Sequence, residues 1–384
     1  MPLEQIPTIS TTPACQKAAK PKKNRERPIQ RYRLAVQIGF AALCVWIGVE
    51  FYYFVRYLES GGVAAFVERP PGVDGFLPIS SLMSLYYFLL SGQVHWAHPA
   101  GLFILVAIIT VSWVFGKASC SWLCPVGLLS ELLGDIGEKL NRGRLAPPRW
   151  LDYPLRGLKY VLLGFFVWAI FFAMTGPALR AFLDSPYNIV ADIKMYYFFA
   201  DISRFALIVL AALFVLSIVI RNFWCRYLCP YGALLGIVGL LSPTRIKRIA
   251  VSCIDCGKCA KVCPSRVRVD RVRAVVSDEC TSCLQCVDVC PVADTLRVQT
   301  TVGRARVPKT LIAAGVVGLF VLITGLGVIS GHWQNRVSGE EYLRHQEQLH
   351  AYGHPTSSDD ISELNDETAG ADGSPSETKG NNHE

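Results

Sequence analysis

The chain has 384 residues, of which 52% are hydrophobic and only 18% are charged, and its formal net charge is +8. Soluble domains usually carry about 25% charged residues, so this composition favours a membrane protein over a large soluble one. The 11% of aromatic residues excludes disorder throughout, and we expect no nucleic-acid partner because the basic residues flank apolar segments, where a membrane explains them better.

Residues 1–33 form a basic N-terminal segment that lacks the apolar region and cleavage site of a signal peptide, so we expect an uncleaved membrane anchor. The apolar segments that follow are Leu34–Phe54, Ala100–Phe115, Tyr160–Leu179, Phe205–Ile220 and Leu311–Trp333. A membrane span needs about 20 residues, which the first, third and fifth segments reach. The sequence therefore predicts a mainly α-helical, polytopic membrane bundle of about five spans. The membrane domain covers residues 34–247, and a final transmembrane helix covers 309–333.

The positive charges predict the orientation of this bundle. If the N-terminus is inside, the inside segments carry 30 Lys and Arg residues and the outside segments carry 8. Positive residues accumulate on the cytoplasmic side of a membrane protein. We therefore expect a multi-pass protein of the cytoplasmic (inner) membrane, with residues 221–309 in the cytoplasm. The acidic residues 334–384, rich in Ser, Gly, Asn and Asp, predict a disordered tail on the outside.

Residues 248–302 contain one cysteine run twice, C-x2-C-x2-C-x3-C-P. This run is typical of bacterial ferredoxins with two 4Fe–4S clusters, in which the last cysteine of each run binds the other cluster. Zinc is the alternative, but zinc sites favour separated C-x2-C pairs and need only four ligands. We predict a small α+β, bacterial-type two-cluster ferredoxin module inserted into the membrane protein. One cluster is assigned to Cys253, Cys256, Cys259 and Cys290, and the other to Cys280, Cys283, Cys286 and Cys263.

A second repeat, C-x3-C-P, follows each of the two shorter apolar segments. Its cysteines are Cys120 and Cys124 in the first copy and Cys225 and Cys229 in the second. Residues i and i+4 share one face of a helix, and both copies are expected on the cytoplasmic side. The four thiols could then form a third metal or redox-active site, with Lys117, Arg221 and Arg226 nearby to favour thiolate. The alternative is structural: cysteines packed at helix ends, where the proline stops the helix.

Weaker signals lie elsewhere in the membrane domain. His95 and His98 are expected where the second span enters from the outside. They could bind haem or quinone, and the alternative is a polar anchor at the membrane surface. The segment Val126–Leu140 has the pattern of an amphipathic surface helix.

Apolar spans, C-x3-C-P motifs at span ends and paired ferredoxin runs resemble the membrane polyferredoxins, a family that includes NapH-like, NosR-like and CcoG-like proteins. The resemblance covers roughly residues 34–300. It implies cluster ligation by the eight cysteines of the two runs and electron movement at the cytoplasmic membrane. The loop of residues 55–99 is too short for the large flavin-binding domain of NosR-like proteins, and the acidic tail does not suit the folded C-terminal domain of CcoG-like proteins.

We therefore expect a membrane-bound iron–sulfur electron-transfer protein that passes electrons between quinol and a redox protein partner, with quinone as a candidate cofactor. A quinol-linked oxidoreductase subunit is one form of this function. Two alternatives stay open: an accessory or maturation factor that reduces a metal or thiol for a respiratory enzyme, and a redox-sensing regulator. A Gly-rich nucleotide fingerprint is absent from the sequence, which argues against direct oxidation of NADH.

Overall fold

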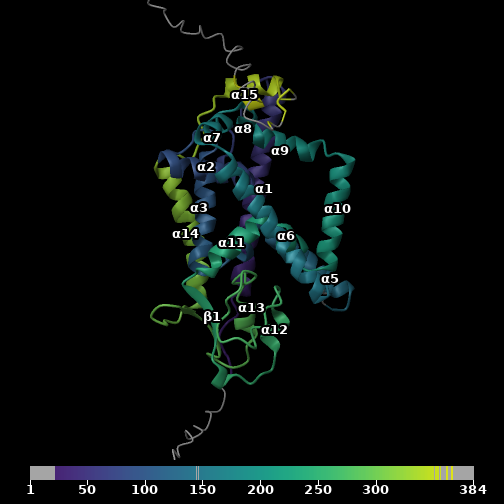
Figure 1. The fold of residues 1–384 in the computed structure, drawn as a ribbon, viewed down its shortest axis with the longest axis vertical. Coiled ribbons are helices and arrows are strands. Elements are labelled where there is room, and N and C mark those ends of the chain that lie inside the picture. The colour runs from purple at the N-terminus through teal and green to yellow at the C-terminus, as the bar shows by residue number, and fades with distance from the viewer. Residues whose placement is uncertain are drawn as a thin grey trace, which may run out of the picture.

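The computed structural model describes residues 22–143, 145, 147–349, 351–353, 355, 360–361 and 365. Helices form an elongated bundle, and a small cysteine-rich module lies at one end of it (Figure 1). The helices of the bundle are α1 (Gln30–Glu59), α2 (Pro78–Ser91), α3 (Pro99–Phe115), α4 (Ser119–Trp122), α5 (Pro125–Leu140), α6 (Arg149–Trp168), α7 (Gly176–Leu183), α8 (Pro186–Ile189), α9 (Ala191–Ala200), α10 (Arg204–Val219), α11 (Pro230–Leu240), α14 (Lys309–Ile329) and α15 (Gly339–Glu347). The module contains β1 (Thr244–Arg248), α12 (Lys258–Val262), α13 (Gln285–Val289) and β2 (Leu296–Thr300). Short 3-10 or π-helical segments are η1 (Pro71–Phe76), η2 (Ala169–Ala173), η3 (Trp224–Leu228) and η4 (Ala250–Ser252).

Among the described residues, three helices are long and apolar enough to cross a membrane: α1, Trp150–Ala173 and α14. They contain most of the first, third and fifth predicted spans. The second predicted span is α3, which has 17 residues, and the fourth is α10, which has 16. Helices α9 and α10 count as one further candidate span, although they are bent by 82° at the break between them. The predicted mainly helical fold, with helices long and apolar enough to span a membrane, is confirmed, while membrane insertion and the count of five spans stay predictions.

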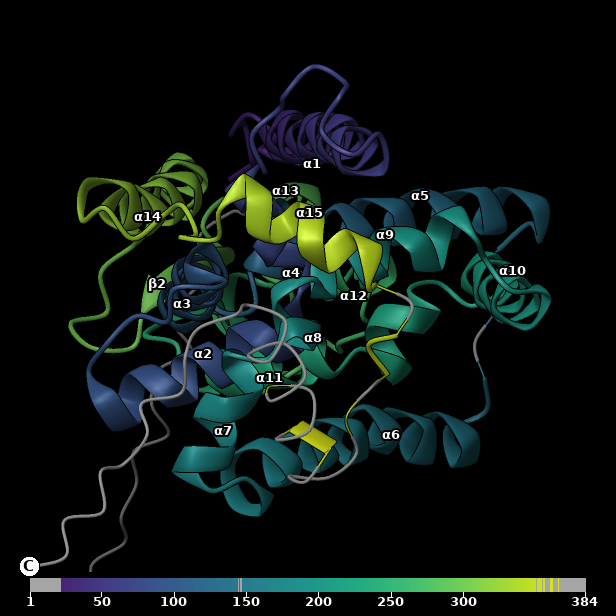
Figure 2. The ribbon, with the colours of Figure 1, turned by 90° about the horizontal axis from the view of Figure 1, so that it is seen from above.

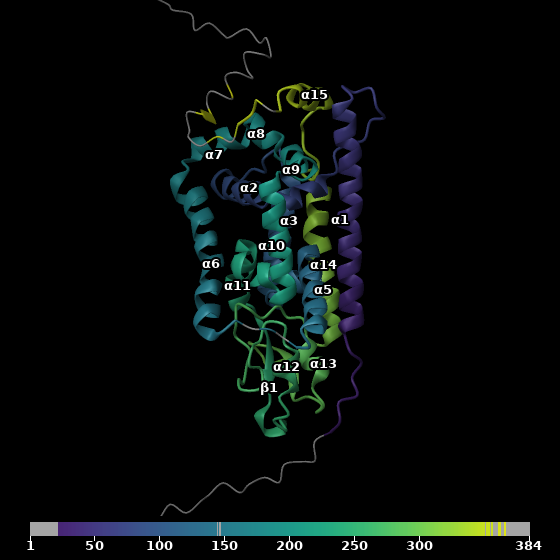
Figure 3. The ribbon, with the colours of Figure 1, turned by 90° about the vertical axis from the view of Figure 1, so that its right-hand side faces the viewer.

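The long helices expose apolar side chains that a soluble protein would bury. On α1, Val45 is 66% exposed and Trp46 is 63% exposed, and on α14, Ile329 is 85% exposed. Figure 3 shows these two helices running side by side along the bundle, with α12 and α13 beyond one end. Extended apolar faces of this kind mark a surface in contact with lipid or a partner. Together with the lengths of the helices, these faces are typical of a membrane protein.

The third predicted span, Tyr160–Leu179, has the wrong boundaries. The helix begins at Arg149 and its π-helical continuation ends at Ala173. The chain then breaks because Thr175 caps a new helix, α7, in which Pro177 occupies the first turn. Proline is well suited to the first turn of a helix and disfavours helical geometry in the residue before it. An apolar run alone did not reveal this break.

The cysteine-rich module and the bundle share one hydrophobic core. Val111 of α3, Trp122 of α4 and Ile312 of α14 pack in the same buried cluster as Leu284 and Val287 of the module. Strands β1 and β2 are antiparallel, with Thr244 opposite Thr300 near the bundle and Arg248 opposite Leu296 away from it. The module is therefore built onto the end of the bundle and is not tethered to it by a linker.

The opposite end of the bundle is covered by α15, which crosses it beside α1 and α9 (Figure 2). Ser338 caps this helix by accepting a hydrogen bond from the backbone N–H of Glu341. Tyr342, Leu349 and Tyr352 are buried in a cluster with aromatic residues of α1. The predicted disordered tail from residue 334 is therefore wrong for its first part, because these apolar side chains have a surface to pack on. Most of the remaining tail, and residues 1–21 of the basic segment, lie outside the described residues.

Candidate metal centres

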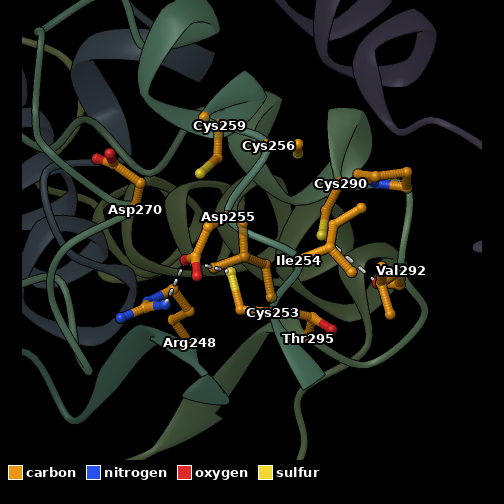
Figure 4. A pocket seen from close by; sticks show the side chains of 13 residues that line it. Arg248, Cys253, Ile254, Asp255, Cys256, Cys259, Asp270, Cys290, Val292 and Thr295 are labelled. Carbon is orange, nitrogen blue, oxygen red and sulfur yellow. Dashed lines mark hydrogen bonds and ion pairs between the residues drawn. The ribbon is translucent and has the colours of Figure 1, made fainter. Parts of the chain in front are cut away.

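The cysteines of the module surround two separate cavities. The distal cavity is lined by Cys253, Cys256, Cys259 and Cys290 (Figure 4). The proximal cavity is lined by Cys263, Cys280, Cys283 and Cys286. Each cavity thus combines three cysteines of one run with the last cysteine of the other run, as in the predicted crossed assignment.

The two runs reach this geometry through the same backbone conformation. Left-handed φ angles occur on both sides of the second cysteine, at Asp255 and Gly257 in the first run and at Ser282 and Leu284 in the second. These turns fold three cysteines around one space, and a short helix begins directly afterwards. Leu284 has φ 62° although it has a branched side chain, a conformation that costs about 1–3 kcal/mol. Such strain is typical of functional sites.

The last cysteine of each run leaves its helix in an extended conformation. Cys263 and Cys290 are the C-caps of α12 and α13, and a proline follows each. A residue before proline is driven out of helical geometry. The sulfur therefore turns away from its own run, and Cys263 lines the proximal cavity while Cys290 lines the distal one.

The electrostatics of the proximal cavity fit a positively charged group. Burial, together with repulsion from Cys263, raises the pKa of Cys280 to about 12 and that of Cys283 to about 11. Backbone N–H groups of Ser282 and Gln285 offset part of this rise. Four neighbouring thiolates need a cationic centre to hold their charge, which iron–sulfur clusters supply. The donor set therefore fits a 4Fe–4S cluster, which when bound supplies one-electron chemistry.

No three His, Cys, Asp or Glu side chains of the described chain converge closely enough to hold a single metal ion. A 4Fe–4S cluster does not need such convergence, because each thiolate binds a different iron. A zinc ion needs four ligands at about 2.0–2.3 Å from one point. The eight cysteines form two crossed sets of four, which is the ligand arrangement of a two-cluster ferredoxin and favours iron–sulfur over the zinc alternative.

The C-x3-C-P pairs do not share a helical face, which corrects the prediction. Cys120 lies in α4, but Cys124 is the extended N-cap of α5; likewise Cys225 lies in η3 and Cys229 is the extended N-cap of α11. The helix breaks at the second cysteine because a proline follows it. Both copies continue as C-x3-C-P-x-G, and in the first copy the glycine is sterically required, because a Cβ on Gly127 would lie 2.2 Å from the carbonyl oxygen of Cys120.

The four C-x3-C-P thiols nevertheless lie in one neighbourhood. Cys225 interacts electrostatically with Cys124, Cys229 and Cys120, and Cys120 interacts with Cys124 and Cys229. Cys44 of α1 also interacts with Cys124, a proximity that the sequence did not indicate. The two copies of the motif thus meet at the bundle end that carries the module.

The first C-x3-C-P copy contacts the proximal cavity directly. The Ser121 hydroxyl donates a hydrogen bond of 2.6 Å to the carbonyl oxygen of Thr281, and the Trp122 indole N–H donates one of 3.2 Å to that of Ser282. Thr281 and Ser282 separate two cysteines of the proximal cavity. Helix α1 adds a third contact, from Gln30 Nε2 to the carbonyl oxygen of Cys283 at 3.1 Å. The proximal cavity is therefore fixed to the bundle.

The cations predicted beside the C-x3-C-P motifs have different roles. Arg226 pairs with Asp152, and Arg221 pairs with carboxylates of α5, so neither is reserved for a thiol. Lys117 does lie within electrostatic range of Cys120. Sequence reasoning missed Lys159, whose fully buried ammonium lies 2.5 Å from Glu279, the residue before Cys280. The only sign of this residue in the sequence was a single lysine in a largely apolar helix, and its role became clear only when the structure placed Glu279 beside it.

His95 and His98 lie at the far end of α3, away from every cysteine motif. His98 is buried between Asp74, at 3.0 Å, and the backbone carbonyl of Asn188, at 2.6 Å. Arg69 bridges Asp74 and Asp192 at 2.5 Å each. Although burial opposes it, Arg69 and His98 lower the pKa of Asp74 to about 2. This ion network ties η1 to α3 and α9.

His95 differs from His98 because it lines a cavity. Its Nε2 lies 3.1 Å from the Asp184 carboxylate, and the cavity is also lined by Trp96, His332 and Arg336. Helix α3, with 17 residues, separates this cavity from Cys120 by roughly 25 Å. The haem or quinone role of these histidines stays a prediction.

Comparison with known proteins gives two matching family models. A 4Fe–4S binding domain matches residues 97–143 and 204–248, the two segments that contain the C-x3-C-P motifs, and a 4Fe–4S dicluster domain matches residues 245–298. No solved structure matches the chain.

Among curated relatives, YccM of Escherichia coli (strain K12), named as an electron transport protein, is 46% identical over 86% of this chain and 94% of its own length. The methylamine utilization ferredoxin-type protein MauN of Methylorubrum extorquens is 30% identical over 49% of this chain and 61% of its length. The ferredoxin-type protein NapH of Haemophilus influenzae is 29% identical over 50% of this chain and 67% of its length. The chain therefore belongs to the family of YccM, within the membrane polyferredoxin-like proteins whose motifs it carries.

Proposed function

We propose that this protein is a membrane-bound electron-transfer protein that holds one 4Fe–4S cluster in each cavity of its module. The observation that carries the proposal is the grouping of eight cysteines into two crossed sets of four around two cavities. The electron-transport name of YccM and the ferredoxin-type names of MauN and NapH support it. The distal ligands are Cys253, Cys256, Cys259 and Cys290, and the proximal ligands are Cys263, Cys280, Cys283 and Cys286.

The contacts between bundle and module support an order for this transfer. Electrons are exchanged with the membrane domain at the proximal cavity, which Ser121 and Trp122 of the first C-x3-C-P copy touch. They are exchanged with a soluble protein at the distal cavity. Cys259 of the distal set and Cys286 of the proximal set interact electrostatically, which supports passage of electrons between the two centres.

The four C-x3-C-P cysteines form a third, shared redox or metal site in this proposal. Their mutual proximity and the 4Fe–4S model that matches both copies support it. Quinol is the membrane substrate, because an apolar bundle end with a redox site beside it suits a lipid-soluble two-electron donor. The 30-to-8 distribution of positive charges supports a cytoplasmic-membrane location with the module in the cytoplasm.

Anaerobic iron and sulfide analysis of the purified protein tests the cluster proposal. We expect about eight iron atoms from the two module clusters, and about twelve if the third site is also a 4Fe–4S cluster. Zinc without iron would overturn the proposal. Alkaline phosphatase, which is active only when exported, tests the orientation: a fusion at Gly353 should be active and a fusion at Gln299 should be silent.

Reduction of the module centres by menaquinol and ubiquinol tests the route. Cys120→Ser and Cys225→Ser should each abolish reduction by quinol while the module keeps its iron. Their effects should not add, because losing one ligand already disables a shared site. Independent, additive losses would favour the structural alternative for these cysteines.

A further inference from the structure

The surface around the distal cavity is strongly basic. Residues 258–273 contain six Lys and Arg residues and a single Asp. The exposed ones are Lys258 and Lys261 on α12 and Arg268, Arg271 and Arg273 on the loop that follows, and we call these five residues the basic face. Asp270, in the middle of that loop, lines the distal cavity, and the loop is joined to Arg248 in the cavity wall by a 2.8 Å backbone hydrogen bond to Arg273.

An exposed apolar area adjoins the distal cavity, whose wall also includes Asp270 of the loop that carries part of the basic face. Ile254, in the wall of the distal cavity, is 52% exposed and Val251 beside it is 84% exposed. Cys256, between them and α12, is exposed as well. An apolar centre with a charged rim is the usual anatomy of a transient protein interface. Large exposed apolar side chains have a clear reason at the lipid-facing helices, but this tip of the module lies beyond the bundle (Figure 1).

Membrane orientation does not account for these charges. Positive residues direct the topology of a membrane protein when they lie within roughly 15–20 residues of a span end. Arg268, Arg271 and Arg273 lie farther than that from both α11 and α14. Nearby carboxylates do not neutralise this segment: Asp255 lies 3.7 Å from Arg248 and Asp270 lies 3.6 Å from Arg268, and residues 258–273 contain six basic residues against one acidic residue.

We propose that the basic face is the docking surface for a soluble one-electron carrier protein with an acidic patch around its own redox group. This inference rests on the proposed function, because it assigns the partner of the distal centre. Docking places the partner over the exposed wall of the distal cavity. One electron then moves between the two redox groups, so that one is oxidised as the other is reduced. Opposite charges steer such an encounter and bring its association rate under the control of ionic strength.

Binding of the full-length protein in nanodiscs of zwitterionic lipid tests the proposal. The probe is flavodoxin, an acidic flavin-containing electron carrier, and basic cytochrome c is the opposite-charge control. We expect flavodoxin to bind at low ionic strength, with an affinity that falls steeply as salt is added. The Lys258→Glu, Arg271→Glu double variant should bind it at least about tenfold more weakly.

The single variant Arg271→Glu is measured beside the double variant, and Arg304→Glu, which also reverses one charge, is its matched control. Arg304 is also exposed and belongs to the module, but it follows β2 at the end where Thr300 pairs with Thr244, opposite the distal cavity. Its charge reversal should change flavodoxin affinity less than about twofold. An equal loss in both variants means that only total charge matters, and it overturns the docking surface. Binding of cytochrome c but not flavodoxin, or binding only to vesicles of phosphatidylglycerol, also overturns it.

Iron content is measured in each sample, which separates this proposal from the proposed function. Normal iron with unchanged flavodoxin binding in the double variant refutes the docking surface alone. Wild-type protein without iron refutes the proposed function, whatever its binding behaviour.

Discussion

The distal and proximal cavities are built from the same sequence run and the same backbone turns, but they face different surroundings. The distal cavity has an exposed wall that includes Cys256 and Ile254. The proximal cavity is lined by Cys286 and Leu284, which are buried, and its ligand loop accepts hydrogen bonds from α1 and α4. Duplication thus produced two similar ligand sets, and the rest of the protein made them unequal.

This inequality has a functional consequence. Solvent exposure, net charge and hydrogen bonds around the sulfurs set the reduction potential of an iron–sulfur cluster. The distal ligand set includes the exposed Cys256 and lies beside the basic residues that follow it in the chain, whereas the proximal set has no exposed cysteine and its ligand loop contacts the bundle. A two-cluster module with one end in the bundle and the other in solution is suited to carry electrons away from, or into, the membrane domain.

The largest expected effect comes from replacing the one cysteine that each run contributes to the other run's cavity. Cys290→Ser should remove the distal cluster, although Cys290 belongs to the second run, and Cys263→Ser should remove the proximal cluster. Each variant should lose about half of the module's iron. Electron paramagnetic resonance of the reduced protein should show one remaining signal, without the spin coupling of the wild type.

The control for this pair is Cys44→Ser, since Cys44 lies in α1 and lines neither cavity. It should keep both module signals. The crossed arrangement is wrong if Cys290→Ser removes the same signal as Cys283→Ser.

Loss of Lys159 should destabilise the proximal cluster site more than the distal one. Its ammonium is fully buried, 2.5 Å from Glu279 and 3.5 Å from Asp278, both directly before Cys280. Lys159→Met leaves these carboxylates without their cation, and removing one partner of a buried ion pair costs about 3–5 kcal/mol. We expect a marked fall in the thermal unfolding midpoint and selective loss of the proximal signal.

Arg268→Met provides the matched comparison, because Arg268 is 54% exposed and lies 3.6 Å from Asp270. An exposed pair contributes at most about 1 kcal/mol. The double variant Lys159→Met, Glu279→Gln should recover part of the lost stability. Equal destabilisation by Lys159→Met and Arg268→Met would contradict the role of Lys159 as an anchor of the module.

Sequence reasoning was strongest where chemistry imposes a fixed spacing. The eight module cysteines and their crossed grouping follow from ligand geometry, and helix α1 follows from an uninterrupted apolar run. The break of each C-x3-C-P motif at its second cysteine was missed because the i, i+4 rule was applied across a residue that precedes proline. Lys159 and α15 were missed for another reason: each is stabilised by a partner far away in the sequence, which local patterns do not reveal.

Replacing the glycine of each C-x3-C-P-x-G motif by alanine should affect the stability of the two copies differently. A Cβ on Gly127 would lie 2.2 Å from the carbonyl oxygen of Cys120, whereas a Cβ on Gly232 would lie 3.2 Å from that of Cys225. Gly127→Ala must move the backbone of the copy that supports the proximal cavity, at a cost of about 1–3 kcal/mol. For Gly232→Ala, the gain in helix propensity of about 1 kcal/mol offsets most of the strain.

Chemical unfolding of the two variants measures this difference directly. Gly127→Ala should lower the free energy of unfolding and perturb the proximal signal, while Gly232→Ala should stay close to wild type. A larger loss in Gly232→Ala would show that the second copy, and not the first, supports the module.

The smallest expected effect concerns one hydrogen bond between bundle and module. Trp122 is fully buried, and its indole N–H donates to the carbonyl oxygen of Ser282, a residue held at φ 50°. Trp122→Phe keeps an aromatic ring in the core but leaves this carbonyl without its donor, which costs about 1–3 kcal/mol. Ser282 lies between Cys280 and Cys283, so the released loop should broaden and shift the proximal resonance signal and leave the distal one unchanged.

Trp150→Phe, at a side chain that is 76% exposed, removes an indole with no such contact to the module and should alter neither signal. Because the two cavities share one module, an equal shift of both signals in Trp122→Phe would mean that the bundle acts on the module as a whole and does not single out its proximal side.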